Sequence, residues 1–211
     1  MEIEMKYGIK DKDSAEAIWE DDFLNEMGDV DARETVFMKA AYFDTKVHIL
    51  SKNDIAFRVR MEGNRIVASL KWNGSGEEGL HIRKEINVPV DDPACFIQPS
   101  PDLFKESDTG RMLMNLIGDQ LIYSMLEIHI LRRRLRLDTG DSIVEVAVDT
   151  GEIITDFGNL PICELEIELF SGEKEDVKAI GTKLAEKYNL VPLNVSKYAR
   201  GLNFIAEYIK H

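Results

Sequence analysis

The most regular feature of the chain is a two-residue alternation of polar and apolar side chains, which is typical of β-strands whose two faces differ. It starts at the second residue, where Glu2, Glu4 and Lys6 alternate with Ile3 and Met5. Further β-rich runs follow, and turn signals rich in Gly, Asn and Asp separate them. These additional predicted strands are residues 34–45, 53–63, 64–74, 79–90, 123–141, 142–153 and 160–172.

Three segments have the apolar spacing that predicts amphipathic helices. Residues 11–28 are expected to form one helix, with Ser14 as its cap and Ala17 on its apolar face. The other two predicted helices, residues 173–190 and 196–211, lie at the end of the chain.

Long runs of strands with helices at the edges favour an antiparallel sheet that closes or curves strongly, rather than a parallel α/β fold. The chain has 211 residues, of which 44% are hydrophobic, so it can bury one large core. We therefore expect a single α+β domain over residues 1–211. Residues 92–121 are expected to be an insertion or connector that shapes one mouth of the closed sheet.

The formal net charge of −13 argues against binding of nucleic acid or an anionic membrane over a broad surface. No apolar stretch is long enough to cross a bilayer, and the N-terminus has no secretory signal pattern. Cys95 and Cys163 are too few for a disulfide framework and lack zinc-ligand spacing. We expect a cytoplasmic monomer or homodimer that binds neither nucleic acid nor membrane.

The polar faces of several predicted strands carry rows of charges of one sign. One interpretation is that each strand is half-buried and its polar face is solvated, as in many antiparallel sheets. Solvated faces usually mix polar residue types, however, and these rows crowd like charges about 7 Å apart along a strand. The rows are Arg58 and Arg60; Arg132, Arg134 and Arg136; and Glu164, Glu166 and Glu168.

Charged rows that face the inside of a barrel would make a poor core but a good site for a polyanion with a divalent metal. Carboxylate oxygens suit Mg²⁺ or Mn²⁺, and the planar fork of arginine binds two phosphate oxygens at once. Phosphoryl transfer uses this combination, because cations neutralise the substrate while carboxylates hold the metal and position a water molecule.

Eight segments, in order along nearly the whole chain, carry a family resemblance: Glu2-x-Glu4-x-Lys6, YFDT at Tyr42 to Thr45, Arg58-x-Arg60, the Lys71 strand, RRRLRL, VAVDTGEI, ICELEIELFSG and SKYARG. Together they resemble the CYTH superfamily, the triphosphate tunnel metalloenzymes, and ICELEIELFSGE and GLHIRKE in particular resemble its bacterial inorganic triphosphatase branch. The resemblance implies a closed eight-stranded antiparallel β-barrel that forms a tunnel with flanking helices. It also implies cleavage of the terminal phosphoanhydride of a triphosphate with Mg²⁺ or Mn²⁺.

Several branches of this superfamily carry a C-terminal helical CHAD domain, and we expect none in this chain. The resemblance implies that Glu2, Glu4 and Lys6 are catalytic. The implied metal ligands are Glu2, Glu4, Asp149, Glu164 and Glu166. The implied substrate contacts are Lys6, Arg58, Arg60, Lys71, Arg83, Arg132, Arg134, Lys197 and Arg200.

The resemblance predicts a metal-dependent triphosphatase that converts inorganic triphosphate, a small substrate, into pyrophosphate and phosphate. A class IV type adenylyl cyclase and a thiamine or nucleoside triphosphatase are alternatives that would need a ring-docking surface, for which Trp19, Tyr42 and Trp72 are candidates. A non-catalytic polyphosphate-binding module is a third alternative. Alanine at Glu4 or Glu166 is expected to abolish turnover and leave the fold intact, because it would relieve like-charge repulsion.

Overall fold

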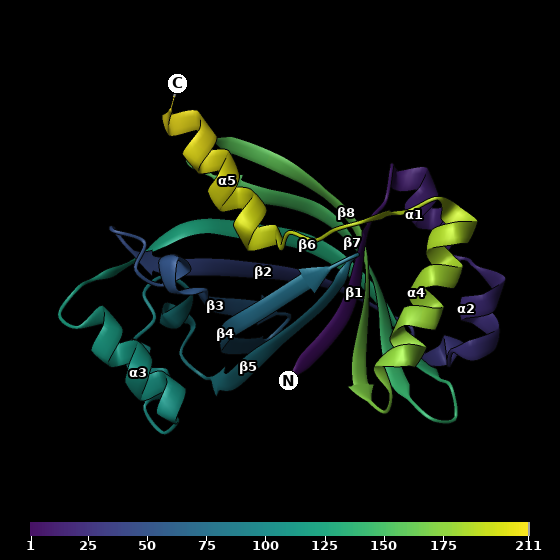
Figure 1. Ribbon diagram of the computed structural model, residues 1–211, viewed down its shortest axis with the longest axis horizontal. Coiled ribbons are helices and arrows are strands. Elements are labelled where there is room, and N and C mark those ends of the chain that lie inside the picture. The colour runs from purple at the N-terminus through teal and green to yellow at the C-terminus, as the bar shows by residue number, and fades with distance from the viewer. Residues whose placement is uncertain (211) are drawn as a thin grey trace.

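The structure, a computed structural model that describes residues 1–210, is built around a sheet that closes on itself (Figure 1). The strand order is β5-β4-β3-β2-β6-β7-β8-β1-β9, and β1 also pairs with β5. Because every pair is antiparallel, this confirms the predicted closed eight-stranded barrel, to which β9 adds a short edge. The strands are β1 (Glu2–Gly8), β2 (Glu34–Thr45), β3 (Ile55–Glu62), β4 (Arg65–Glu77), β5 (Leu80–Val90), β6 (Ile122–Asp138), β7 (Ile143–Thr155), β8 (Gly158–Ser171) and β9 (Val191–Pro192).

Closure of the barrel depends on the first strand, which joins β5 to β8. On one side of β1, Glu2 lies opposite Arg83, and on the other side Lys6 lies opposite Glu166. Directly opposed residues of an antiparallel pair point to the same face, and opposite charges there contribute up to about 1 kcal/mol. The charged face of β1 therefore points the same way as the charged faces of β5 and β8.

The outer face of β1, β7 and β8 is covered by α1 (Lys12–Trp19), α2 (Asp22–Met27) and α4 (Lys174–Tyr188), which Figure 1 shows on one side of the barrel. Met5 is buried in this cluster, as expected for a side chain that points outward beneath the helices. Ile3 is only half-buried. Burial of one aliphatic side chain contributes about 1.5–3 kcal/mol, so this cluster anchors the N-terminal strand.

The prediction of one helix over residues 11–28 is wrong, because a second N-cap interrupts it. Asp11, rather than Ser14, caps α1, and its carboxylate accepts hydrogen bonds from the Ser14 backbone N–H and hydroxyl at 2.8 and 2.7 Å. Asp21 then caps α2 by accepting from the backbone N–H two residues later, at 2.8 Å. Aspartate side chains compete with the helical backbone for such donors, so the helix stops and restarts. Ala17, which was expected to be apolar-facing, is exposed.

Residues 92–121 pack on the outside of the barrel, rather than at its mouth as expected. Phe104 and Leu113 are almost fully buried against the outer face of β2, β3 and β4. The Phe104 ring meets that of Phe57 edge-on, with centroids 5.3 Å apart. This insertion therefore supplies the apolar cover that the outer face of the arginine-bearing strand β3 requires. It contains two short 3₁₀ helices, η3 (Pro93–Phe96) and η4 (Pro101–Phe104), and α3 (Asp108–Ile117).

The last helix, α5 (Lys197–Ile209), contacts β6 and β7 and begins over the inside of the barrel. Ser196 caps it, and Tyr198 in its first turn stacks on Tyr42 of β2 with ring centroids 4.6 Å apart. The predicted helix extended to His211, which lies outside the described residues. Within residues 1–210, no helix is long and apolar enough to cross a membrane.

Gly151 of β7 marks a close approach of two backbones, because a Cβ placed there would lie 2.0 Å from the carbonyl oxygen of His129 on β6. We expect Gly151→Ala to lower the free energy of unfolding by about 2 kcal/mol, since neither ladder strand can move freely. Gly74 of β4 is a matched control, because the nearest atom to its Cβ would be 3.9 Å away. Urea denaturation should show a change within about 0.5 kcal/mol for Gly74→Ala, and equal losses in both variants would contradict the prediction.

Candidate active site

The inside of the barrel is lined by the charged strand faces that the alternation indicated. Phe57 and Val59 of β3 are buried in the outer cluster, whereas Arg58 and Arg60 line an internal cavity of about 90 Å³. Most of the predicted site residues line the same cavity: Glu2, Glu4, Lys6, Arg58, Arg60, Lys71, Arg83, Arg132, Asp149, Glu166 and Lys197.

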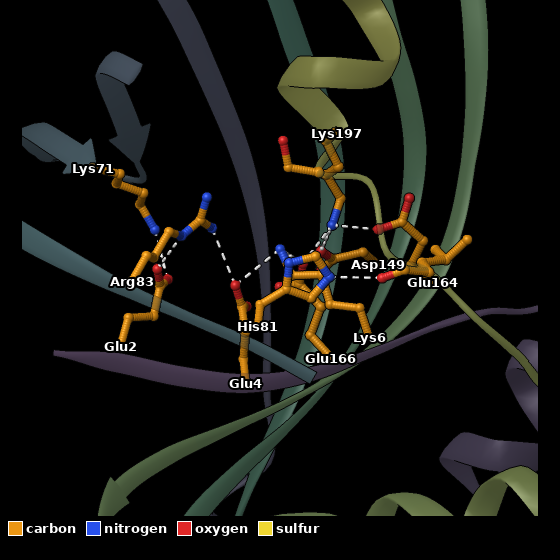
Figure 2. Close-up of polar contacts among 12 residues, drawn as sticks. Glu2, Glu4, Lys6, Lys71, His81, Arg83, Asp149, Glu164, Glu166 and Lys197 are labelled. Atoms are coloured by element: carbon orange, nitrogen blue, oxygen red, sulfur yellow. Dashed lines mark hydrogen bonds and ion pairs between the residues drawn. The ribbon is translucent and has the colours of Figure 1, made fainter. Parts of the chain in front are cut away.

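Lys197, the first residue of α5, is the centre of one half of the site (Figure 2). Its Nζ lies 2.7 Å from Glu166 Oε1 and 2.7 Å from Glu164 Oε2. Asp149 Oδ2 lies 3.0 Å from the same nitrogen, and the β7–β8 register places Asp149 directly opposite Glu164. Arg132 binds both oxygens of Asp149, at 2.8 and 2.7 Å, and also contacts Glu166. Three carboxylates from two strands thus surround one ammonium group.

Glu2 is the centre of the other half. Lys71 Nζ lies 2.6 Å from Glu2 Oε1, and Arg83 Nε lies 2.5 Å from Glu2 Oε2. The same guanidinium reaches Glu4 at 3.1 Å, and Figure 2 shows it between the two glutamates of β1. These contacts bridge the closing pair of strands, so the same residues that close the barrel line its cavity.

Lys6 links the two halves into one network. Its Nζ lies 3.0 Å from Glu4 Oε1 and 3.3 Å from Glu166 Oε1. Burial would lower the pKa of this lysine, but the two carboxylates outweigh burial and raise its pKa. A continuous chain of alternating charges therefore crosses the cavity.

This pairing keeps buried acids and bases ionised. Burial alone would raise the pKa of Glu166 and of Glu2, but their lysine and arginine partners hold both pKa values well below the usual range. Burial would lower the pKa of Lys197, and its carboxylate partners raise it well above the usual value instead. Glu4 and Glu166 each contact cations, so removal of either carboxylate would break ion pairs, in contrast to the expected relief of like-charge repulsion.

The two arginines of β3 are less completely paired. Arg58 lies 3.5 Å from Glu85, and Arg60 lies 3.6 Å from Glu62. In both arginines, Nε is buried with no hydrogen-bond partner among the described residues. Burial, together with Arg58 and Arg132, lowers the pKa of Arg60 to about 10. These guanidiniums keep unused capacity to bind an anion.

The carboxylates assigned to metal by resemblance fall into two groups. Asp149, Glu164 and Glu166 meet at Lys197, whereas the two glutamates of β1 pair with cations of the opposite wall. Within residues 1–210, no acidic, histidine or cysteine side chains form a ready cluster of three metal ligands. The oxygen donors suit Mg²⁺ or Mn²⁺ in chemistry. Because the ammonium of Lys197 lies where three donors meet, a divalent ion could use them only after Lys197 moves.

Two predicted substrate contacts lie beside the central cavity rather than in its lining. Arg134 pairs with Glu34 and Glu62, both at 2.7 Å, toward one end of the barrel. Arg200, one turn into α5, pairs with Glu164. The structure therefore brings both arginines to the edge of the site, and their contact with substrate stays a prediction.

Sequence reasoning missed an apolar part of the cavity lining. Met38 and Ala40 of β2, with Ile128 and Ile130 of β6, line the side near α5. The sequence did contain a signal for this apolar lining, because Ile128 and Ile130 share the strand face of Arg132. One wall of the cavity therefore cannot bind charged groups.

The aromatic candidates for ring docking lie in three different places. Trp19 is buried outside the barrel under two arginines, and Tyr42 lines the cavity beneath α5. Trp72 borders a side pocket of about 160 Å³ that shares Lys71 and Arg83 with the central cavity. Tyr42 and Trp72 therefore both lie near the cationic wall, and Trp72 also borders the separate side pocket.

Glu168 of β8 had no assigned role, yet it lines the cavity without an ion pair among the described residues. Burial, together with the charges of Glu2 and Glu4, raises its pKa from 4.5 to about 7. Carboxylates with raised pKa values in a cavity are common at functional sites.

The raised pKa of Glu168 predicts a pH-dependent stability. Between about pH 4.5 and 7 the folded protein binds a proton that the unfolded chain has released, so the free energy of unfolding falls as pH rises. Glu168→Gln should be more stable than the wild type at pH 8 by about 1–3 kcal/mol and nearly equal at pH 4.5. Urea denaturation in EDTA at several pH values measures these free energies of unfolding, and exposed Glu186→Gln is the control. Parallel pH profiles for Glu168→Gln and wild type would contradict it.

Comparison with known proteins identifies the family. Residues 1–202 match the family model of the CYTH domain. The chain is 30% identical over 173 residues to an inorganic triphosphatase of Haemophilus influenzae, an alignment that covers 80% of this chain and 46% of the relative. The chain therefore spans about half the length of this curated relative.

Solved structures share the fold at lower sequence identity. A Hippeastrum protein assigned as an adenylyl cyclase, and described as having a dominant triphosphatase activity, superposes with a TM-score of 0.68 at 21% identity, over 96% of both chains. The capping-enzyme triphosphatase of Mimivirus gives a TM-score of 0.51 at 10% identity, over 89% of both chains. With the family-model match over residues 1–202 and the closed barrel, these results show that the chain belongs to the CYTH domain family.

Proposed function

We propose that the protein is a divalent-metal-dependent triphosphatase that hydrolyses inorganic triphosphate to pyrophosphate and phosphate inside the barrel. The observation that carries the proposal is the buried network of opposite charges that crosses the cavity. Burying ions costs several kcal/mol each, so a structural core would gain from apolar residues instead. The triphosphatase relative from Haemophilus influenzae supports the same reaction class.

The cations would bind the phosphate chain. Arg58 and Arg60 have buried Nε–H groups free for phosphate oxygens, and Lys71 and Arg83 flank them. A planar guanidinium can donate two parallel hydrogen bonds to one phosphate group. The apolar wall on β2 and β6 would exclude water from the opposite side, which strengthens these charged contacts.

Asp149, Glu164 and Glu166 would hold the metal once Lys197 has moved, with the glutamates of β1 as further ligands. A bound Mg²⁺ or Mn²⁺ supplies charge neutralisation at phosphate oxygens and acidifies water. The displaced ammonium of Lys197, at the start of α5, would then be free to contact the substrate.

The reaction needs no side-chain nucleophile. A water oxygen attacks the terminal phosphorus, its proton passes to a cavity carboxylate, and the bond from that phosphorus to the bridging oxygen breaks. Pyrophosphate then leaves with its new charge neutralised by Lys6, Arg58 and Arg60. ³¹P NMR of triphosphate incubated with the protein should show equal amounts of pyrophosphate and phosphate with Mg²⁺ or Mn²⁺, and none with EDTA. Binding without product would instead support a polyphosphate-binding module.

An organic triphosphate is a second candidate, which the side pocket beside Trp72 favours. Ile55 and Leu202 make part of this pocket apolar, and Lys71 and Arg83 connect it to the cationic wall. A base or thiazolium ring could pack there while its phosphates occupy the cavity. Comparing kcat/KM for triphosphate, ATP and thiamine triphosphate, in wild type and Trp72→Ala, tests this candidate directly.

Glu166→Ala should abolish turnover and also destabilise the protein. The substitution leaves Arg132, Lys6 and Lys197 with less negative charge, and breaking one member of a buried ion network costs about 3 kcal/mol. We expect kcat to fall at least about 100-fold, by analogy with the loss of one transition-state stabilising group. Phosphate release and urea denaturation measure the two effects, with exposed Glu207→Ala as control. Near-normal turnover would show that Glu166 holds no metal.

Lys197→Met should bind Mn²⁺ more tightly, although it should be less active. Removal of the ammonium frees Asp149, Glu164 and Glu166 from a cation that competes for the same oxygens. If the loss of one competing contact improves the binding free energy by about 1.4 kcal/mol, the Kd for Mn²⁺ falls about tenfold. Isothermal titration with Mn²⁺ alone measures it, and exposed Lys10→Met should match the wild type. Unchanged or weaker Mn²⁺ binding in Lys197→Met would contradict the inference that the Lys197 ammonium and the metal ion use the same carboxylate oxygens.

A further inference from the structure

The linker between α4 and α5, residues 189–196, ends directly at the residue whose ammonium occupies one half of the site (Figure 1). Ser196 caps α5, and Lys197 is the first residue of that helix. The Lys197 ammonium contacts the three carboxylates that the proposed function assigns to the metal. A contact that fixes the end of this linker therefore also fixes the point from which the Lys197 side chain extends.

His81 of β5 makes such a contact, and the proposed reaction does not otherwise use it. Its Nε2 lies 2.6 Å from the carbonyl oxygen of Leu193. A carbonyl oxygen only accepts hydrogen bonds, so Nε2 carries the proton and donates it. The imidazole is buried and lies opposite Glu4 in the β1–β5 register, and Figure 2 shows it in the same group of side chains as Lys197. From the strand face that also carries Arg83, His81 thus reaches the chain just before α5.

Two further hydrogen bonds hold the same part of the linker. The Leu193 N–H donates to the carbonyl oxygen of Lys6 at 2.9 Å. The Gly79 N–H, in the turn before β5, donates to Asn194 Oδ1 at 2.8 Å. Gly79 has a φ of +83°, and a Cβ there would lie 2.8 Å from the Lys6 carbonyl oxygen, so this close approach requires glycine. The linker is therefore attached to β1, to β5 and to the turn between β4 and β5 at one place.

The ion pairs of Lys197 depend on accurate placement of its backbone. The ammonium lies 2.7 Å from two carboxylates and 3.0 Å from the third, and charge-assisted hydrogen bonds weaken as these distances grow. The first turn of α5 is also held by the stacking of Tyr198 on Tyr42. Release of the linker would therefore loosen Lys197 without detaching the helix.

We propose that His81 is a positioning residue which, together with Asn194, holds the Lys197 ammonium among its three carboxylate partners. The inference rests on the proposed function, because it takes these carboxylates as the metal ligands. His81 acts through Lys197 rather than on the metal, since its Nε2 is committed to the Leu193 carbonyl group. Without this hydrogen bond the ammonium would leave the carboxylates more readily, and a divalent ion would meet a weaker competitor for their oxygens.

A double-mutant cycle on Mn²⁺ affinity tests whether His81 acts through Lys197. Isothermal titration of the full chain with Mn²⁺ alone would compare wild type, His81→Ala, Lys197→Met and the double variant. His81→Ala should lower the Kd about threefold, which is less than the tenfold decrease expected for Lys197→Met. In the Lys197→Met background the same substitution should leave the Kd within about 1.5-fold, because no ammonium remains to be positioned.

Two other variants keep the test informative if His81→Ala is poorly folded, which urea denaturation would show. His81→Gln keeps an N–H donor near the position of Nε2, so its Kd for Mn²⁺ should lie within about 1.5-fold of wild type. Asn194 is exposed, so Asn194→Ala should fold normally and lower the Kd about twofold. His129→Ala, on the outer face of β6, is the control for loss of an imidazole and should match the wild type.

Unchanged or weaker Mn²⁺ binding in folded His81→Ala, or in Asn194→Ala, would overturn the proposal. An equal effect of His81→Ala in the wild-type and Lys197→Met backgrounds would also overturn it, because the histidine would then act independently of the lysine. Phosphate release from triphosphate, measured in parallel, separates this failure from failure of the proposed function. A protein that shows the Lys197-dependent effect but releases no phosphate with Mg²⁺ or Mn²⁺ would keep the positioning role and lose the triphosphatase.

Discussion

A charged side chain inside a protein costs several kcal/mol unless an opposite charge accompanies it, and this cost governs the interior of the barrel. Lys6, Lys197 and Arg132 are buried, and each contacts at least one buried carboxylate. Under the proposed function, this paired state is the resting state, and a polyanion and a metal would replace the internal counterions. In this proposal, substrate phosphates would replace carboxylates beside the arginines, and a divalent ion would replace the ammonium beside the carboxylates.

The same constraint explains the rest of the architecture. A barrel whose inner face is largely charged has only a small apolar cluster inside, so most of its stability must come from apolar side chains on the outer face. Separate apolar clusters meet this need, under α1, α2 and α4 on one side and under α3 with its insertion on another. The helices are therefore required to fold a strand set whose other face carries mostly charged side chains.

Much of this fold could be predicted from the sequence, because strand alternation has a period of two and the charged rows share it. Arg58, Lys71, Asp149 and Glu166 all point inward as that period requires. Competition between side chains and the helical backbone for hydrogen bonds was not predictable in the same way. Asp21 splits the first helix by capping a backbone N–H, a choice between two local hydrogen-bond patterns that periodicity does not encode.

The ion-pair partners of each charged side chain could not be predicted from the sequence either, because they depend on how the strands and helices are placed in three dimensions. The convergence of Asp149, Glu164 and Glu166 on Lys197 joins two strands to a helix more than 30 positions away, and no spacing rule relates them. The same applies to Glu168, whose raised pKa arises from burial and from glutamates at the other end of the chain. Sequence identifies which residues face inward, and the folded structure determines which of them are already neutralised.

Diffraction from crystals grown with Mn²⁺ alone, recorded at the manganese absorption edge, would test the exchange of internal counterions most directly. We expect an anomalous peak among Asp149, Glu164 and Glu166, with Lys197 displaced from all three carboxylates. A peak elsewhere on the protein, with Lys197 still bonded to these carboxylates, would contradict it.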